Sequence, residues 1–417
     1  MTHTIEILAS VLFALAIAHT FLASRFESLA HKCPAHSGLL DFLGEVEAVF
    51  GIWALVLVVA MSLMLGVDKA IAHLEGLNFT EPMFVFAIMV IAASKPVIFF
   101  CRKLVGLVAG LLPLPRTLAL FFVMLSLVPL LGSFVTEPAA MTLAALMLRE
   151  RFYSKGISTR LKYATLGVLF VNVSIGGTLT NFAAPPVLMV ASTWGWDTTY
   201  MLTHFGWRAA LAVLVNAAVL TALFARELRA LEAPSGARED AMPLPMMVVH
   251  LLFLAGVVVF AHHPVVFMAL LLLFLGFATS YGRYQDRLIL REGLMVALFL
   301  AGLVVLGSLQ KWWLQPLLSG MDDTVLFFGA TALTAVTDNA ALTYLGSLVE
   351  GVGEGFKYAL VAGAVTGGGL TVIANAPNPA GFAMLKNYFP DQAISPLGLL
   401  AAALGPTLVA IVAFKVL

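Results

Sequence analysis

The sequence contains few charged residues for its length of 417. Only 23 basic (Lys and Arg) and 23 acidic (Asp and Glu) residues are present, so charged residues make up 11% of the chain, against about 25% in a typical soluble domain. Because 61% of the residues are hydrophobic, the chain cannot cover a water-facing surface, which excludes a cytosolic enzyme and a disordered protein. The formal net charge of zero gives no reason to expect a nucleic-acid partner.

Cysteine is also scarce, since Cys33 and Cys101 are the only two, too few for a disulfide framework. The apolar stretches do not alternate with a period of two, which excludes an outer-membrane β-barrel. The composition therefore predicts an all-α polytopic membrane protein whose main partner is the lipid bilayer. The first apolar segment, Ile5 to Ala23, has no basic stretch before it and no small-residue cleavage site, so we expect a retained span.

Ten segments are apolar over enough residues to suggest membrane spans, which need about 20 residues. They are 5–24, 39–65, 83–100, 163–193, 205–224, 246–261, 264–281, 293–310, 357–379 and 396–416. Two further stretches, 117–148 and 324–349, are interrupted by polar residues. Their arms of about 10 to 16 residues are too short to cross alone, so each stretch is predicted to be a re-entrant hairpin.

The flanking charges predict the orientation of these hairpins. Arg116 precedes the first hairpin and Arg149 and Arg151 follow it, which places both of its ends in the cytoplasm because positive residues stay inside. Asp322 and Glu354 flank the second hairpin, whose ends are therefore expected outside. Counting through the spans predicts a multi-pass protein of the bacterial inner membrane with both termini on the outer side.

The two hairpin tips also resemble each other, with TEPAAMT at 136–142 and TDNAALT at 337–343. The next helix of each half carries the pattern Leu-Thr-x-x-Ala-x-x-Pro, at 179–186 and 370–377. This order predicts an inverted repeat of five transmembrane helices plus one hairpin per half. Residues 1–224 would form the N-terminal repeat, 225–245 a cytoplasmic linker and 246–417 the C-terminal repeat. The helices 163–193 and 357–379 would be broken near the midplane.

Irregular backbone at membrane depth survives only where protein or water satisfies its polar groups. Each tip also carries an acid, Glu137 or Asp338, whose insertion at a helix centre costs about 2.5–3.5 kcal/mol. Helix capping, by Thr136 and Asp338, would account for part of this pattern. Because burial favours the neutral form of a carboxyl group, we also expect these acids to exchange protons for a hard cation such as Na⁺, without a transition metal. The other predicted ligands are Thr136, Thr337, Asn339, Thr178, Thr180, Asn181, Thr371 and Asn375.

Four further polar residues lie within or near spans and are candidates for coupling. Lys95 either reaches the membrane interface or takes part in the site. Glu45 and Glu47 cannot share one helix face, so one of them is expected to face a partner, with Lys95 or His19 as candidates. His19 itself is either a hydrogen-bonded packing residue or a proton relay.

These motifs resemble the ion transporter superfamily. The sequence SIGGT at 174–178, followed by APP at 184–186, is similar to the unwound Gly-Gly-Thr…Thr-Pro-Pro-Asn segment of divalent anion/sodium symporters. Those symporters carry Ser-Asn-Thr at the tips, whereas TDN at 337–339 resembles the Asp-Asn pair of the antiporter and arsenite-permease branches. The chain looks most like a small family of bacterial proteins described as sodium/proton antiporters. The resemblance implies a homodimer with a static scaffold and an elevator-like transport domain.

Together these features predict a secondary transporter that uses no cofactor and exchanges Na⁺ or another monovalent cation for H⁺ by alternating access. The alternative is a Na⁺- or H⁺-coupled anion symporter, which would hold its anion at the half-helix N-termini. An intramembrane enzyme has no support, because the sequence contains no His-Glu-x-x-His or Gly-x-Ser-x-Gly motif.

Overall fold

A computed structural model describes residues 3–231 and 242–417, and every regular element within these two ranges is helical. Six helical segments in these ranges are long and apolar enough to cross a membrane, or seven if the bent pair Val67–Glu75 and Thr80–Ala92 is one span. The six are His3–Thr20, Glu47–Leu65, Arg116–Val135, Thr198–Leu223, Leu290–Gly307 and Pro396–Lys415. The prediction of an all-helical polytopic membrane protein is confirmed, whereas the inverted repeat stays a prediction.

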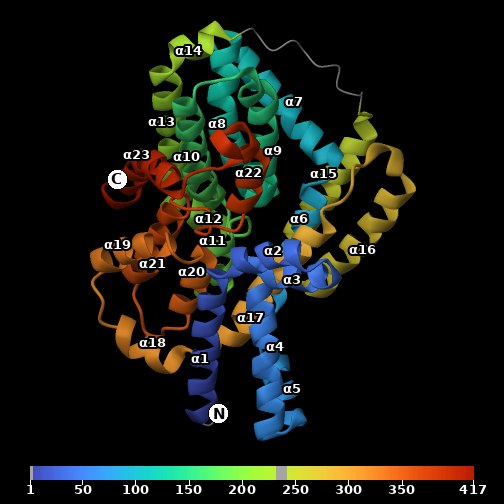
Figure 1. Cartoon of the computed structure of the whole chain (residues 1–417), viewed down its shortest axis with the longest axis vertical. Helices are drawn as coiled ribbons and strands as arrows, with labels where there is room; N and C mark the ends of the chain where they lie inside the picture. The colour runs from blue at the N-terminus through green and yellow to red at the C-terminus, as the bar shows by residue number, and fades with distance from the viewer. Residues whose placement is uncertain (1–2, 232–241) are drawn as a thin grey trace.

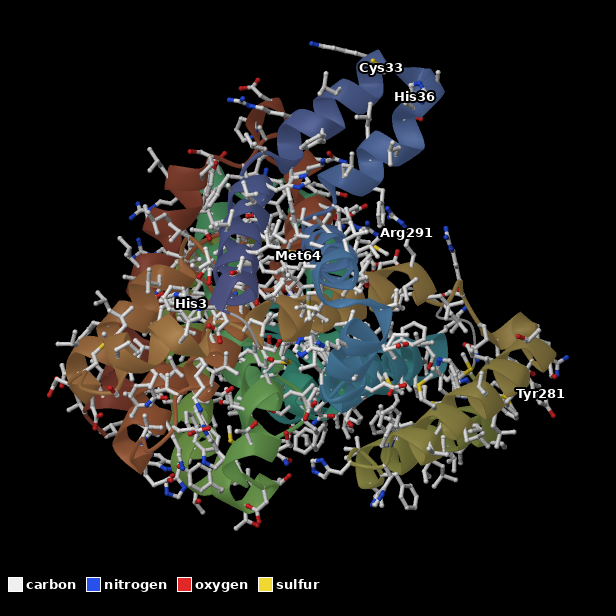
Figure 2. All side chains as sticks on the ribbon, turned by 90° about the horizontal axis from the view of Figure 1, so that it is seen from below. His3, Cys33, His36, Met64, Tyr281 and Arg291 are labelled. Atoms are coloured by element: carbon white, nitrogen blue, oxygen red, sulfur yellow. The ribbon has the colours of Figure 1, made fainter. Side chains whose placement is uncertain are left out.

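The N-terminal helices differ from the predicted spans at two places. Span 39–65 is split at Glu45, and span 83–100 is split at Ala93–Ser94, because Pro96 occupies the first turn of the following helix and cannot continue the preceding one. Figure 2 shows the segment that carries Cys33 and His36 projecting at the edge of the molecule. The helices are α1 (His3–Thr20), α2 (Ala23–Lys32), α3 (Ser37–Gly44), α4 (Val46–Leu65), α5 (Val67–Glu75), α6 (Thr80–Ala92) and α7 (Lys95–Leu111).

The first predicted hairpin consists of α8 (Arg116–Val135) and α9 (Glu137–Arg151), which pack against each other and meet at Thr136. The expectation that both arms are too short to cross is wrong for α8, which has 20 residues and continues through Pro129. Neighbouring elements can satisfy the carbonyl that a proline leaves free within a membrane helix, so Pro129 does not end α8. Both ends of the hairpin lie near the top of Figure 1, beside α14 (Ala225–Ala230).

The helix predicted at 163–193 is broken, as expected, into α10 (Thr159–Gly176), the 3₁₀ turn η3 (Gly177–Leu179) and α11 (Pro185–Trp194). It is followed by α12 (Thr198–Met201), the π-helical turn η4 (Leu202–Gly206) and α13 (Trp207–Leu223). The predicted linker 225–245 contains α14, but its residues 232–241 lie outside the described part of the chain.

The C-terminal half contains the second predicted hairpin, formed by the short helices α19 (Asp323–Thr334) and α20 (Asn339–Ser347). The helix predicted at 357–379 is broken into α21 (Glu354–Gly367) and α22 (Asn378–Leu385). An additional helix, α18 (Lys311–Leu318), precedes α19. The remaining helices are α15 (Leu244–Val259), α16 (Pro264–Ser280), α17 (Leu290–Gly307) and α23 (Pro396–Lys415). Short turns lie at Tyr153–Lys155, Gly282–Tyr284, Lys386–Tyr388 and Pro390–Gln392.

Close glycine contacts hold together the helices around the centre. A Cβ on Gly363 or Gly367 of α21 would collide with the carbonyl oxygens of Phe327 and Thr331 on α19. This spacing of two glycines four residues apart lets membrane helices pack closely. Gly302 of α17 likewise lies directly against the backbone of Phe50 on α4. The pairs α19–α21 and α4–α17 therefore form two tightly packed units.

The charge distribution predicts where the ends of each hairpin can be reached. Single cysteines in place of Arg116 and Ser154, both exposed, should react with a membrane-impermeant thiol reagent only from the cytoplasm. Cysteines in place of the exposed Asp322 and Glu354 should react only from outside. The background protein has Cys33, which is exposed, replaced by alanine, whereas Cys101 is buried and can remain. Labelling of the two ends of one hairpin from opposite sides would contradict the topology.

Candidate functional site

The tip of the first hairpin and the break after α10 are joined by Ser133, near the end of α8. The Ser133 hydroxyl donates to the Gly176 carbonyl at 2.7 Å and accepts from the Leu179 amide at 2.9 Å. The Thr180 hydroxyl donates to the Ser133 carbonyl at 2.6 Å. These bonds satisfy backbone groups that the broken helix leaves without partners, and they hold η3 beside the hairpin tip.

Glu137 lies where this junction meets the second broken helix. The side chain is completely buried in the first turn of α9 and lies directly over Gly177, where a Cβ would collide with it. Asn375, in the break between α21 and α22, donates from Nδ2 to Glu137 Oε2 at 2.9 Å. The other carboxyl oxygen, Oε1, is buried and accepts no hydrogen bond from the described residues. The sequence predicts four interruptions of helical structure: the two hairpin tips, the break after α10 and the break after α21. The Glu137 carboxyl group links three of these interruptions, namely the first hairpin tip and the two breaks.

The fourth interruption, the tip of the second hairpin, is bonded to this group through the first residue of α20. The backbone amide of Asn339 donates to the Ala374 carbonyl at 3.1 Å, which binds the second hairpin tip to the break that carries Asn375. Asp338 Oδ1 accepts from the amides of Ala340 and Ala341 at 2.8 and 3.2 Å, so its predicted capping role is confirmed. The capping predicted for Thr136 is wrong, because its side chain makes no cap hydrogen bond.

The two tips differ in register although their sequences match. Glu137 is the first residue of α9, whereas Asp338 precedes α20, whose first residue is Asn339. By helix position, therefore, Glu137 corresponds to Asn339 and Thr136 to Asp338. Thr136 has a φ of 80°, a conformation that costs a non-glycine residue on the order of 1–3 kcal/mol and often marks functional sites.

Glu47, at the start of α4, also faces this region. It lines a cavity of about 50 Å³ together with Asp338, Asn375 and Phe299. A second cavity, of about 90 Å³, lies against Asp338, Thr337 and Thr20, and its other walls are apolar side chains from α1, α4, α17, α20 and the two interrupted segments beside them. Glu47, Asp338, Asn375 and Glu137 therefore form a continuous series of polar groups.

The partners predicted for the weaker candidates are wrong. Glu45 forms an ion pair with Arg291, and Lys95 pairs with Asp286 at 3.2 Å, so neither glutamate pairs with Lys95. His19 contacts the Leu43 carbonyl at 3.0 Å and accepts from Trp53 Nε1 at 3.2 Å, as a packing residue would. The physical reason is the break at Glu45: Glu45 lies in extended backbone between α3 and α4, whereas Glu47 lies in the first turn of α4.

Four predicted hydroxyl ligands donate their protons to nearby carbonyls. Thr178 bonds to Ile175, Thr337 to Leu333 and Thr371 to Ala335, at 2.7 to 2.9 Å, and Thr180 bonds to Ser133 as described. Asn181 lies apart from the central group, because its Nδ2 donates to the Trp196 carbonyl and its Oδ1 accepts from Thr198.

Asn378 and Ser174 were not predicted from the sequence. Asn378 Nδ2 donates to the carbonyls of Gly368 and Thr371 at 2.8 and 2.9 Å, and the Ser174 hydroxyl donates to the Val365 carbonyl at 2.7 Å. Both therefore stabilise the broken helices. The position of Asn378 between two prolines in the second break was the signal that could have identified it.

Several buried polar atoms at this centre have no hydrogen-bond partner among the described residues. Such atoms are rare in native proteins and call for a ligand, a proton or water. Most of them are oxygens, the ligand type that hard cations prefer. The atoms are Thr136 Oγ1, Glu137 Oε1, Asn339 Oδ1 and Nδ2, Asn375 Oδ1 and Asn378 Oδ1. This arrangement can bind a small cation or a proton.

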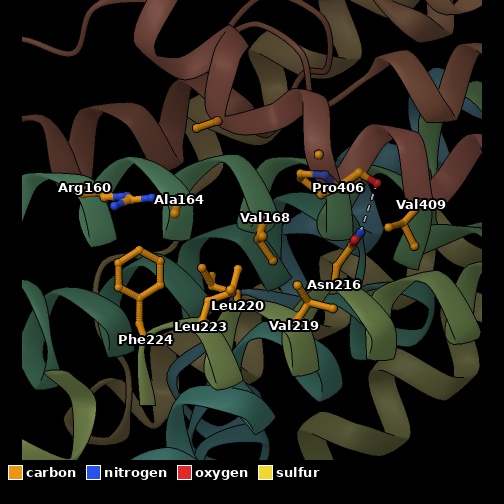
Figure 3. A pocket seen from close by; sticks show the side chains of 12 residues that line it. Arg160, Ala164, Val168, Asn216, Val219, Leu220, Leu223, Phe224, Pro406 and Val409 are labelled. Carbon is orange, nitrogen blue, oxygen red and sulfur yellow. Dashed lines mark hydrogen bonds between the residues drawn. The ribbon is translucent and has the colours of Figure 1, made fainter. Parts of the chain in front are cut away.

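A larger cavity, of about 460 Å³, is elsewhere, between α10, α13 and α23 (Figure 3). Its walls are mainly apolar, with Arg160 towards one end and Asn216 towards the other, where Asn216 Nδ2 donates to the Pro406 carbonyl at 3.3 Å. None of the predicted ion ligands lines it. We therefore place the candidate site at the four interruptions.

Comparison with known families gives a match over nearly the whole chain. The family described as "Putative Na+/H+ antiporter" matches residues 4–417. No curated protein matches the sequence.

The contact between Gly177 and Glu137 predicts an effect of added volume. A Cβ on Gly177 would lie 2.6 Å from Glu137 Cγ, so Gly177→Ala should displace the carboxyl group and lower the free energy of unfolding by about 1–3 kcal/mol. Thermal unfolding of the purified protein in detergent measures this change. Gly106→Ala in α7, where a Cβ would meet no atom within 4 Å, is the matched control and should leave stability unchanged or slightly raised. Equal melting temperatures for both variants and the wild type would contradict the prediction.

Proposed function

Because this chain belongs to the family described as "Putative Na+/H+ antiporter", it is a transporter and not an enzyme, and we propose that it exchanges Na⁺ or another monovalent cation for protons at Glu137 and Asp338. The observation that carries this proposal is the buried Glu137 carboxyl group, which has an amide donor at one oxygen and no partner among the described residues at the other. A buried carboxyl group must be neutralised, by a proton or by a cation. An antiporter must bind each of these ions in turn, so the proton-bound and cation-bound states of Glu137 correspond to its two transported ions.

The chemistry of exchange follows from competition for the same oxygens. With a proton bound, Glu137 is neutral and its burial costs little. When the proton leaves, a cation can take its place, with carboxylate, amide and hydroxyl oxygens as ligands. Asn375 keeps one carboxyl oxygen in position in both states, because an N–H group can donate to a neutral or an ionised carboxyl. Asp338 and Glu47 provide further acidic groups along the same path.

An anion symporter is the second candidate, but the charges at the centre do not favour it. Glu137, Asp338 and Glu47 would repel an anion. Lys95, a basic residue inside a predicted span and the one candidate to offset these acids, forms an ion pair with Asp286 instead. The helix N-termini at α9 and α20 favour anions, yet both already carry an acidic residue.

Alternating access would require one group of helices to move against another. The walls of the two cavities beside Asp338 support such a boundary, because α1, α4 and α17 contribute mainly aromatic and aliphatic side chains on one side. On the other side stand α20 and the break before α22. We propose that the hairpins and broken helices move as the transport part of an inverted-repeat homodimer in the bacterial inner membrane.

The acids should be required for coupled transport. Glu137→Gln or Asp338→Asn should lower Na⁺-driven proton flux in proteoliposomes by about a hundredfold or more, because an amide cannot exchange a proton. Asp338→Asn keeps an oxygen that can cap α20, so the protein should remain folded. Glu47→Gln should lower the flux about tenfold if Glu47 passes protons to Asp338.

Glu45→Gln is the matched control for Glu47→Gln, since Glu45 lies two residues away and pairs with Arg291 at the edge of the site. This variant should transport at nearly the wild-type rate. Wild-type flux in both Glu137→Gln and Asp338→Asn would mean that these residues serve only the structure.

The direction of proton movement separates antiport from symport. Adding Na⁺ outside proteoliposomes with an acidic interior should drive protons out of the vesicle without any particular anion. Lowering the pH on the Na⁺ side should raise the half-saturating Na⁺ concentration, by up to about tenfold per pH unit, because protons then occupy the carboxylates. A pH-sensitive dye inside the vesicles reports the flux. Proton movement only in the presence of a specific anion would establish the symporter instead.

A further inference from the structure

Another cavity, with polar side chains in its wall and separate from the central site, lies between α6, α11 and α15. Its volume is about 130 Å³. Thr80, Ser192 and His262, which line it, belong to the end of the molecule that the topology places outside. Glu81 also lines this cavity and is only 8% exposed. Glu81 was not predicted from the sequence, because it precedes the apolar run at 83–100 by two residues and looks like an interfacial acid.

Two hydrogen bonds reach Glu81, and both end on the same carboxyl oxygen. The Ser192 hydroxyl donates to Oε1 at 2.6 Å, and Asn78 Nδ2 donates to Oε1 at 3.3 Å. Asn78 is itself oriented, because its Oδ1 accepts from the Thr80 amide at 2.9 Å. Within the described residues, Oε2 has no hydrogen-bond or ion-pair partner. A nearly buried carboxylate with one free oxygen therefore borders an open cavity.

The other polar groups around the cavity offer oxygens. Thr198 donates to Asn181 Oδ1 at 2.9 Å, which leaves lone pairs on the Thr198 hydroxyl and on Oδ1 for a ligand. Asn181 Nδ2 is occupied by the Trp196 carbonyl at 3.0 Å, so the amide presents its oxygen and not its N–H group. Among the described lining residues no lysine or arginine is present to neutralise Glu81.

We propose that this cavity binds a monovalent cation of the size of Na⁺, with Glu81 as its charged ligand and with oxygens of Ser192, Asn181 and Thr198 completing the shell. Carboxylate, amide and hydroxyl oxygens suit hard cations. The volume corresponds to about four water molecules, enough for a partly hydrated ion, and is below the ~300 Å³ of sites for organic ligands.

The position of this site suggests its role. Asn181 belongs to the same break as Thr178 and Thr180, which lies beside Glu137. The break that contains Asn181 therefore contributes to both sites, and a cation held at Glu81 would lie on the predicted outer side of the central acids. The site would raise the local cation concentration where the transported ion binds or leaves. This role rests on the proposed function, whereas the binding site itself does not.

Equilibrium binding of radiolabelled Na⁺ to the purified full-length protein in detergent tests the site. The double variant Glu137→Gln/Asp338→Asn should retain part of the Na⁺ binding, because the Glu81 site is separate. Adding Glu81→Gln should weaken this remaining binding by about tenfold or more, corresponding to at least about 1.4 kcal/mol. Ser192→Ala should weaken it less, since one neutral ligand is lost.

Glu75→Gln is the matched control, because Glu75 is an exposed acid at the same predicted end of the molecule and does not line the cavity. It should leave Na⁺ binding unchanged. The Glu81→Gln single variant should still bind Na⁺ at the central site, which shows that it is folded. Absence of remaining binding in the double variant, or remaining binding that Glu81→Gln does not change, would overturn the proposal. A wild-type protein that binds Na⁺ but exchanges no protons would instead refute the proposed function.

Discussion

The hydrogen bond from Asn375 to Glu137 is the interaction on which the centre of the molecule depends. It joins the first hairpin to the second broken helix, and the two bonded residues are 238 positions apart in the sequence. Asn375 can reach Glu137 because the chain between α21 and α22 is not helical, and the carbonyls freed there are satisfied by Asn378. A buried acid without a basic partner is thus held by an amide from a break in a helix, and the break in turn needs polar side chains for its own carbonyls.

This dependence is the reason why several predicted ligands support the backbone instead. The ends of α8 and α19 leave carbonyl groups without helical partners, and hydroxyl side chains of the adjacent breaks donate to them: Thr180 to Ser133 and Thr371 to Ala335. Side chains with two polar ends, such as Asn375, can do both: the N–H group binds Glu137 while the oxygen has no partner among the described residues. Composition alone does not separate these roles, because both need the same residue types in the same segment.

The sequence was sufficient to predict the helical class. The four predicted interruptions also coincide with helix ends, because proline, glycine and polar residues clustered inside an apolar run favour irregular backbone, whereas the re-entrant course of the hairpins stays a prediction. The sequence was not sufficient for contacts between distant elements. The pairing of Glu45 with Arg291, and the facing of Glu47 towards Asp338, depend on a helix break at Glu45, directly after Gly44. A single glycine in an apolar run does not by itself distinguish a break from a continuous helix. The register difference between the tips was also hidden, because the TEP and TDN sequences align without a gap while the helices begin one residue apart.

The packing around the acids indicates where motion would be easiest. Gly363 and Gly367 lie directly against α19, and Gly302 lies directly against α4, so within each pair the two helices are packed too closely to shift easily past each other. Between the two units stand small cavities whose walls are largely apolar and contribute few directional bonds. Glu47 belongs to α4 of one unit, whereas Asp338 follows α19 and the break that carries Asn375 follows α21, the two helices of the other unit. Sliding along this boundary would change the distance between like-charged acids, and with it the free energy of removing a proton from either one. Movement and proton exchange would then be coupled through the separation of these carboxyl groups.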